Sequence, residues 1–390
     1  MKQINIENQS NKKNIYEVIL LCLYYVLASA YIPLCSFLHL GEIALSAISL
    51  AVCVLGILAL SRIAGGFKTI LGYVLILGIF IFLGGSLIPV GIISAFITAV
   101  CVLAHLLLKS YSPFLWGLPV IPFIISVVTV GSAASAAVSL AAFPAALGLA
   151  WSVKDKVGRV SAVCRISAGI CVIAVAAFLC AVHSAYGEIS FSTCKQLIES
   201  FRSTVSSILI TAANEMQSSL GYDSQLINLE QTVSYAVSVA FNVLPALVII
   251  LSNVVAYVIH SLFLSAHFNT AEERKDALPM IAFEMSTVSA VVFLVSLVLS
   301  AVLSAGKWAL YGAVAENLMI ILIPGLVLTA LAGLRVLTMR KGPSCLGTLI
   351  YLGAIFMIAS LSPLVLIAAS IAGAVLVILT QVAKSKAQKK

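Results

Sequence analysis

Charged side chains are scarce in this sequence of 390 residues, where Asp, Glu, Lys and Arg make up 9% and hydrophobic residues 62%. Soluble domains average about 25% charged and roughly 45–50% apolar residues. A chain with so little charge cannot cover a water-exposed surface, which excludes a soluble globular fold. Apolar runs of the length that crosses a bilayer, about 20 residues, recur from Val18 to Ala383. The sequence therefore predicts an all-α, polytopic transmembrane helical bundle.

The motifs of soluble enzymes are also missing. No P-loop, dinucleotide-binding glycine pattern, H-E-x-x-H zinc motif or G-x-S-x-G nucleophile motif occurs, and no two of the nine cysteines form a C-x-x-C pair. Six cysteines lie inside apolar runs, where a thiol acts as a small hydrophobe: Cys22, Cys35, Cys53, Cys101, Cys171 and Cys180. We expect no enzymatic activity, no cofactor and no metal site.

The sequence can be divided at charges and turn residues into about 12 spans. These are 16–38, 43–60, 70–89, 91–108, 114–131, 132–151, 166–185, 232–264, 280–304, 313–334, 346–361 and 363–382. The first span fits an uncleaved helix better than a signal peptide, because its apolar run continues to Leu38 past the small residues Ala28-Ser29-Ala30.

Basic residues indicate the orientation of these spans. The net charge is +8, but Lys and Arg form short clusters between apolar runs rather than one basic face, so no nucleic-acid partner is expected. With a cytoplasmic N-terminus, all but three of the 22 basic residues fall inside, and only Lys195, Arg202 and Lys307 fall outside. The positive-inside rule then predicts that both termini are cytoplasmic.

The loop around Lys154–Arg159 divides the chain into an N-terminal six-helix half (1–165) and a C-terminal six-helix half (166–390), an arrangement common in transporters. The C-terminal half contains one long polar segment, 186–231, predicted to be extracytoplasmic. Apolar residues recur there at helical spacing: Phe191, Cys194, Ile198, Phe201, Val205, Ile208 and Ala212. Two interpretations are open, an amphipathic helix on the outer leaflet or capping the bundle, and a lid over an extracytoplasmic cavity.

Polar side chains inside apolar spans are the candidate binding residues, because they are costly in hydrocarbon. Asn242, Asn253 and His260 are spaced by eleven and seven residues, so they share one face of the predicted helix 232–264. Pro245 would kink this helix and free a backbone carbonyl, as in helices that line transporter cavities. The alternative is that the three residues form hydrogen bonds between packed helices.

Two acidic residues, Glu284 and Glu316, also lie inside apolar spans, and Asn317 follows the second. Both acids are shallow, about five residues or 7 Å from a span end. One interpretation is interfacial anchoring or pairing with a helix dipole. The other is that Glu316 and Asn317 line an outer cavity, where the carboxylate would attract a cation or the amine of a solute.

The region from Val233 to Ile378 resembles the YybS-like family of uncharacterised bacterial membrane proteins. The resemblance rests on four short motifs: Leu244-Pro245-Ala246, Leu278-Pro279, Ala315-Glu316-Asn317-Leu318 and Leu331-Ala332-Gly333-Leu334, with Ser362-Pro363 and Gly373 in the tail. This family is distantly similar to the substrate-binding components of energy-coupling-factor transporters. The resemblance implies a multi-pass protein of the bacterial cytoplasmic membrane that binds a small solute.

These observations favour small-solute binding or transport as the function. The alternative is a non-transporting membrane scaffold or regulator of envelope processes, because buried charge is scarce. The expected partners are the lipid bilayer, a small solute and another membrane protein.

Overall fold

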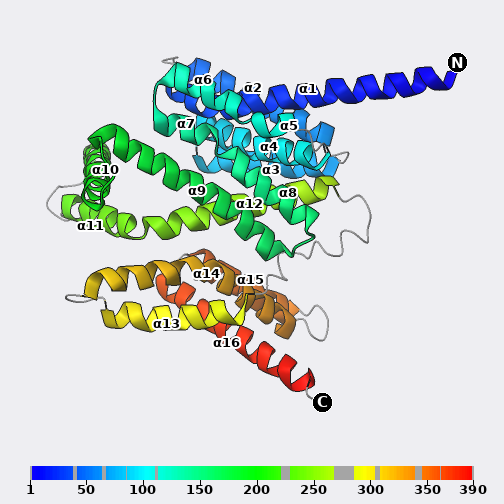
Figure 1. Cartoon of the computed structure of the whole chain (residues 1–390). Coiled ribbons are helices and arrows are strands. Elements are labelled where there is room, and N and C mark those ends of the chain that lie inside the picture. The colour runs from blue at the N-terminus through cyan, green and yellow to red at the C-terminus, as the bar shows by residue number, and fades with distance from the viewer. Residues whose placement is uncertain are drawn as a thin grey trace. The chain divides into compact units, whose positions relative to one another are not determined.

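The computed structural model describes residues 2–37, 42–63, 67–84, 86–109, 113–220, 229–267, 285–303, 308–338, 345–360 and 362–388. Within these ranges every regular element is a helix (Figure 1), as the sequence predicts. The helices of the first half of the chain are α1 (Lys2–Phe37), α2 (Glu42–Ile63), α3 (Phe67–Gly84), α4 (Leu87–Lys109), α5 (Pro113–Gly117), α6 (Val120–Val130), α7 (Ala133–Ser139), α8 (Ala142–Lys154) and α9 (Arg159–Tyr186). Those that follow are α10 (Phe191–Leu220), α11 (Leu229–Asn242), α12 (Leu244–His267), α13 (Thr287–Leu303), α14 (Ala309–Thr338), α15 (Cys345–Ala359) and α16 (Pro363–Gln388).

Seven helical segments in the described ranges are long and apolar enough to cross a membrane, and shorter apolar helices of 10–17 residues accompany them. The long segments are Ile43–Ile63, Leu87–Lys109, Ala136–Lys154, Val160–Tyr186, Leu244–Phe263, Tyr311–Thr338 and Pro363–Ala383. The chain is therefore a multi-pass integral membrane protein. The count of twelve spans stays a prediction.

The structure divides the predicted span 232–264 into α11 and α12, at the place where Pro245 was expected to kink the helix. Val243 forms a turn between them, just before Pro245. Proline has no N–H, and its ring clashes with the carbonyl four residues earlier, so it kinks or breaks a helix. The predicted spans 114–131 and 132–151 are interrupted in the same way, by turns at 118–119 and 140–141.

The chain forms two compact units. The first comprises Met1–Leu197 and Ser252–Ala277, and the second Ile198–Leu251 and Leu278–Lys390. Helix α12 thus begins in the second unit and continues in the first. These units are defined by packing contacts. The halves 1–165 and 166–390 are defined by the order of the predicted spans, and that division stays a prediction.

In the first unit, α4 is the central helix, packed against α1, α2 and α8. Every residue of α4 from Ile97 to Leu106 is buried. Helices α8 and α9 are in backbone contact at two glycines. A Cβ on Gly148 would lie 2.8 Å from the carbonyl oxygen of Arg165, and a Cβ on Gly169 would lie 2.8 Å from the carbonyl oxygen of Pro144. Small residues permit this close approach, which drives helix association in lipid.

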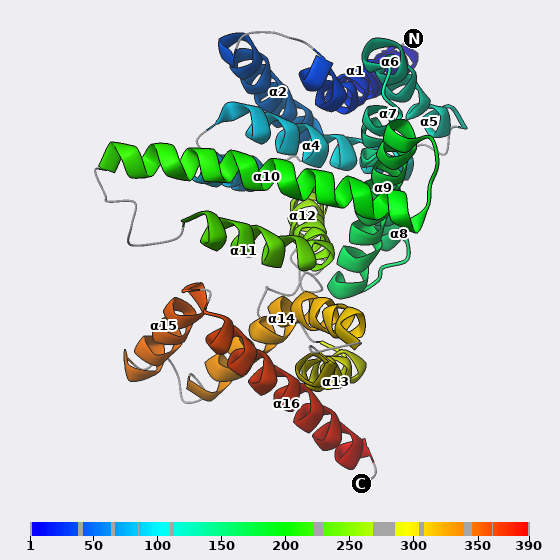
Figure 2. The same ribbon diagram turned by 90° about the vertical axis from the view of Figure 1, so that its left-hand side faces the viewer.

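In the second unit, α14 packs against both α13 and α16, as Figure 2 shows. Phe293 and Leu326 are fully buried at the centre of this group. Gly373 on α16 lies against the backbone of Leu326, and Gly333 on α14 lies against the side chain of Leu376. Both glycines belong to the motifs on which the family resemblance rests, and close packing between α14 and α16 requires them.

Candidate functional site

The Asn317 side chain connects α14 to the joint between α11 and α12. Its Nδ2 donates to the backbone carbonyl of Asn242 at 2.9 Å, and its Oδ1 accepts from the backbone N–H of Ala246 at 3.0 Å. In a continuous helix, the N–H of Ala246 would bond to the carbonyl of Asn242, four residues earlier. The carboxamide of Asn317 is therefore inserted between the two groups that the helix break separates.

This arrangement follows from the sequence at the joint. The helix is interrupted beside Pro245, yet backbone groups in a membrane must find partners because unpaired ones cost several kcal/mol. A carboxamide carries a donor and an acceptor side by side, like a peptide group, so it can serve both the carbonyl and the N–H. Asn317 Nδ2 also donates to the carbonyl of Ala313 within its own helix at 2.9 Å, which fixes its rotamer.

The other predicted binding residues do not gather at this joint. Glu316 is half-buried on α14, next to Asn317. The Asn242 side chain is exposed, Asn253 is half-buried and His260 is buried. Asn253 and His260 lie in the part of α12 that belongs to the first unit, and Glu284 lies outside the described residues.

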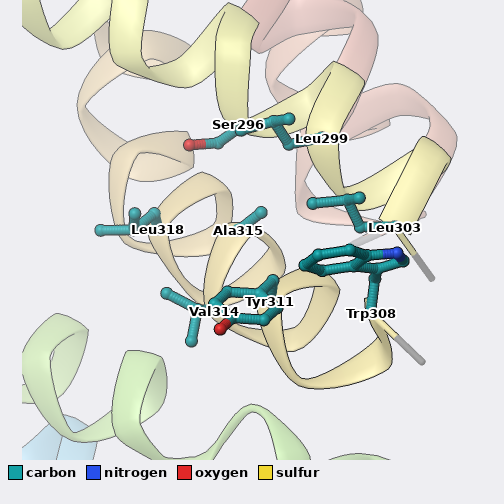
Figure 3. A pocket seen from close by; sticks show the side chains of 8 residues that line it. All are labelled: Ser296, Leu299, Leu303, Trp308, Tyr311, Val314, Ala315 and Leu318. Atoms are coloured by element: carbon teal, nitrogen blue, oxygen red, sulfur yellow. The ribbon is translucent and has the colours of Figure 1, made fainter.

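A pocket of about 450 Å³ lies between α13 and α14 of the second unit (Figure 3). The lining residues recur at helical spacing on each helix: Ser296, Leu299 and Leu303 on α13, and Tyr311, Val314, Ala315 and Leu318 on α14, with Trp308 just before α14. Glu316 is not among them. It follows Ala315 and therefore points to another side of α14.

The two ends of this pocket differ in chemistry. At one end the rings of Trp308 and Tyr311 lie 5.6 Å apart, centroid to centroid, and both are more than half exposed. At the other end is the buried Ser296 (Figure 3), one helix turn beyond Leu299. Seven residues separate Ser296 from Leu303, which corresponds to about 10 Å along α13. The pocket is thus an open, mainly apolar hollow with hydrogen-bonding groups at both ends.

Buried hydroxyl pairs in the first unit were not predicted from the sequence. Tyr24 on α1 pairs with Thr98 on α4, Tyr73 on α3 pairs with Ser94 on α4, and Tyr31 on α1 pairs with Ser49 on α2. The available signal was the seven-residue spacing of Tyr24 and Tyr31, which places both on one face of α1. Hydropathy did not indicate these hydroxyl pairs, since tyrosine is nearly neutral on hydropathy scales.

The direction of two of these hydrogen bonds follows from proton counting. Thr98 donates its hydroxyl proton to the carbonyl of Ser94 at 2.6 Å, and Ser49 donates to the carbonyl of Leu45 at 2.7 Å. A hydroxyl has only one proton, so Tyr24 must donate to Thr98 and Tyr31 to Ser49. These pairs hold helices in register, and they contain neither a charge nor a metal-ligand set.

Within the ranges that the structure describes, no three His, Cys, Asp or Glu residues lie together so that they could hold a metal ion. Eight cysteines are free thiols: Cys22, Cys35, Cys53, Cys101, Cys164, Cys171, Cys180 and Cys194. No family model, curated protein or solved structure matches the chain, so the resemblance to the YybS-like family stays a prediction.

Proposed function

We propose that this membrane protein binds a small amphiphile, taken up from the bilayer, in the pocket between α13 and α14. The observation on which the proposal rests is the pocket itself. Its volume of about 450 Å³ falls within the roughly 300–1,000 Å³ of small-molecule sites, which are lined mainly by apolar and aromatic side chains with a few polar groups.

The lining indicates the class of ligand. It contains no charged side chain, and a charged solute in such a site would lose its hydration without gaining a counter-ion. Leu299, Leu303 and Leu318 instead suit an apolar segment. The polar end of an amphiphile would lie beside Trp308 and Tyr311, the residue types that occupy the headgroup level in membrane proteins.

Glu316 is not a ligand-binding residue in this proposal. It does not line the pocket, so a direct bond to the amine of a solute there is not expected. Its half-buried carboxylate, next to the Asn317 bridge, suits anchoring of α14, the first of the two roles considered from the sequence.

Native mass spectrometry of the purified full-length chain tests the proposal, because a bound amphiphile would appear as an added mass. Ala315→Phe places a ring in the pocket, and we expect it to abolish the added mass. The control is Val298→Phe, since Val298 lies on α13 outside the pocket lining and is already exposed. This variant should retain the ligand.

A diazirine-bearing fatty acid provides an independent readout. Irradiation should attach it to peptides from α13 and α14, and Ala315→Phe should reduce that attachment while Val298→Phe does not. Equal attachment in both variants, or no added mass in the unmodified chain, would refute amphiphile binding at this pocket.

A second candidate function is a non-transporting scaffold, and the hydroxyl pairs of the first unit favour it. Tyr24, Tyr31 and Tyr73 join four helices through hydrogen bonds, an arrangement suited to a rigid bundle rather than to a moving carrier. The mass-spectrometric experiment separates the two functions, because a scaffold needs no retained ligand.

A further inference from the structure

Helix α10 is too polar to cross a bilayer and carries an apolar stripe on one side. Its 30 residues include four charged ones, Lys195, Glu199, Arg202 and Glu215. The α10 stripe consists of Phe191, Cys194, Ile198, Phe201, Val205, Ile208 and Ala212, and successive members are three or four residues apart. A helix with this pattern lies along the surface of a membrane or of a protein.

The stripe is not covered by other described parts of the chain at its bulky positions. Phe191 is 84% exposed, Phe201 57% and Ile208 61%. A neighbouring helix occupies a different side of α10, where the hydroxyls of Ser206 and Ser234 of α11 lie 3.4 Å apart. Ser206 follows Val205 by one residue and so projects about 100° away from it around the helix.

The start of α10 is fixed close to the end of a membrane-spanning helix. The span Val160–Tyr186 ends in α9, where Gly187 adopts a left-handed conformation and its N–H bonds to the carbonyl of His183 at 2.8 Å. Only four residues separate Tyr186 from Phe191. Even a fully extended link would place α10 within about 18 Å of the end of that span.

The first turn of α10 is also capped, which holds the helix start at this place. The N–H of Ser190 donates to Oγ1 of Thr193 at 2.9 Å, and the N–H of Thr193 donates to Oγ of Ser190 at 3.2 Å. This reciprocal pair is a capping box. Helix α10 therefore begins at the membrane interface and cannot extend the apolar run of α9.

We infer that the α10 stripe is inserted into the interfacial layer of the bilayer, with α10 lying parallel to the membrane plane and its charged side in water. The partner is the lipid surface rather than a protein, because the membrane lies within reach of the first turn of α10. Lys195 and Arg202 flank the stripe and can extend their charged ends toward the headgroups. The acidic Glu199 and Glu215 balance them, so zwitterionic lipids are sufficient.

The test uses tryptophan as a probe in the full-length protein reconstituted into phosphatidylcholine vesicles. Phe201→Trp places the probe on the stripe, and the matched variant Ser203→Trp places it on an exposed polar side. Emission is compared with that of the unsubstituted chain to subtract its own three tryptophans. Brominated acyl chains should quench the added emission of Phe201→Trp severalfold more than that of Ser203→Trp, and aqueous acrylamide should show the reverse order.

Two outcomes would overturn this inference. Equal acrylamide quenching of both variants would place the stripe in water, and shielding of Phe201→Trp from both quenchers would mean that protein covers it. Ile208→Trp and Ser207→Trp form a second matched pair in case the first does not fold. These measurements are independent of the α13–α14 pocket, so they neither support nor refute amphiphile binding there.

Discussion

The side-chain amide of Asn317 donates to the backbone carbonyl of Asn242, which lies 75 residues earlier in the chain, at 2.9 Å. The same side chain accepts the N–H of Ala246. Two distant parts of the sequence thus meet at this helix break. Pro245 interrupts the helix, and Asn317 of α14 supplies the amide that bonds the two separated backbone groups.

Replacement of Asn317 by Leu should lower the free energy of unfolding by about 1–3 kcal/mol, the usual cost of leaving buried hydrogen-bonding groups unpaired. Asn317→Asp should also destabilise, because it keeps the acceptor for Ala246 but loses the donor to Asn242. Thermal unfolding of the purified chain in detergent measures the effect. The control is Glu316→Gln, which we expect to change stability by less than about 0.5 kcal/mol. Similar losses for Asn317→Leu and Glu316→Gln would contradict the bridging role.

Gly148→Ala should destabilise the first unit, since the added methyl group would lie 2.8 Å from the carbonyl oxygen of Arg165. Overpacking of this kind costs about 1–3 kcal/mol. The matched control is Gly78→Ala within α3, where nothing lies within 4 Å of the new methyl group. There alanine should stabilise the helix by up to about 1 kcal/mol. The two variants should therefore shift the unfolding midpoint in opposite directions, and shifts of the same sign would argue against a backbone contact between α8 and α9.

Tyr31→Phe removes the donor that serves Ser49 at 2.6 Å. Hydrogen bonds between membrane helices contribute about 0.6 kcal/mol on average and up to about 1.7 kcal/mol, and the loss of stability should fall in that range. Tyr235→Phe is the comparison, because the Tyr235 side chain is largely exposed and its loss should be negligible. Denaturation curves of both variants measure this loss of stability. If the stability of Tyr31→Phe equals that of the unsubstituted chain, the Tyr31–Ser49 pair contributes nothing.

The positive-inside count predicts that α10 faces the outside, whereas the loop between α8 and α9 faces the cytoplasm. A membrane-impermeant thiol reagent applied to intact cells should label Ser203→Cys, which adds a thiol on an exposed side of α10. The exposed Cys164 of α9 should react only after the cells are permeabilised. Labelling of Cys164 first would invert the predicted orientation.

The sequence predicts the membrane class well because hydropathy is a local property, and the structure confirms a multi-pass helical bundle. It also identifies Asn242, Pro245 and Asn317 as unusual residues in apolar surroundings. What it could not supply is the contact among them, since helical periodicity relates residues within one helix and α14 begins far from α11.

The pocket and the hydroxyl pairs escaped prediction for a different reason. Leu299, Leu303 and Leu318 have the same character as side chains that face lipid, so nothing in the sequence marks them as the lining of a pocket. Tyr73 and Ser94 lie in runs that hydropathy treats as ordinary spans. Only the packing of helices from separate parts of the chain brings these residues together.

The bridge at Asn317 also has a consequence for the synthesis of the protein on the ribosome. Ala246 and Asn317 are separated by 71 positions in the sequence. At a translation rate of about 5–20 residues per second, Asn317 is therefore synthesised about 4–14 s after Ala246. During that interval the amide that closes the α11–α12 joint has not been synthesised. The carbonyl of Asn242 and the N–H of Ala246 must then be satisfied by water or lipid headgroups, so the arrival of α14 is the step that dehydrates the joint.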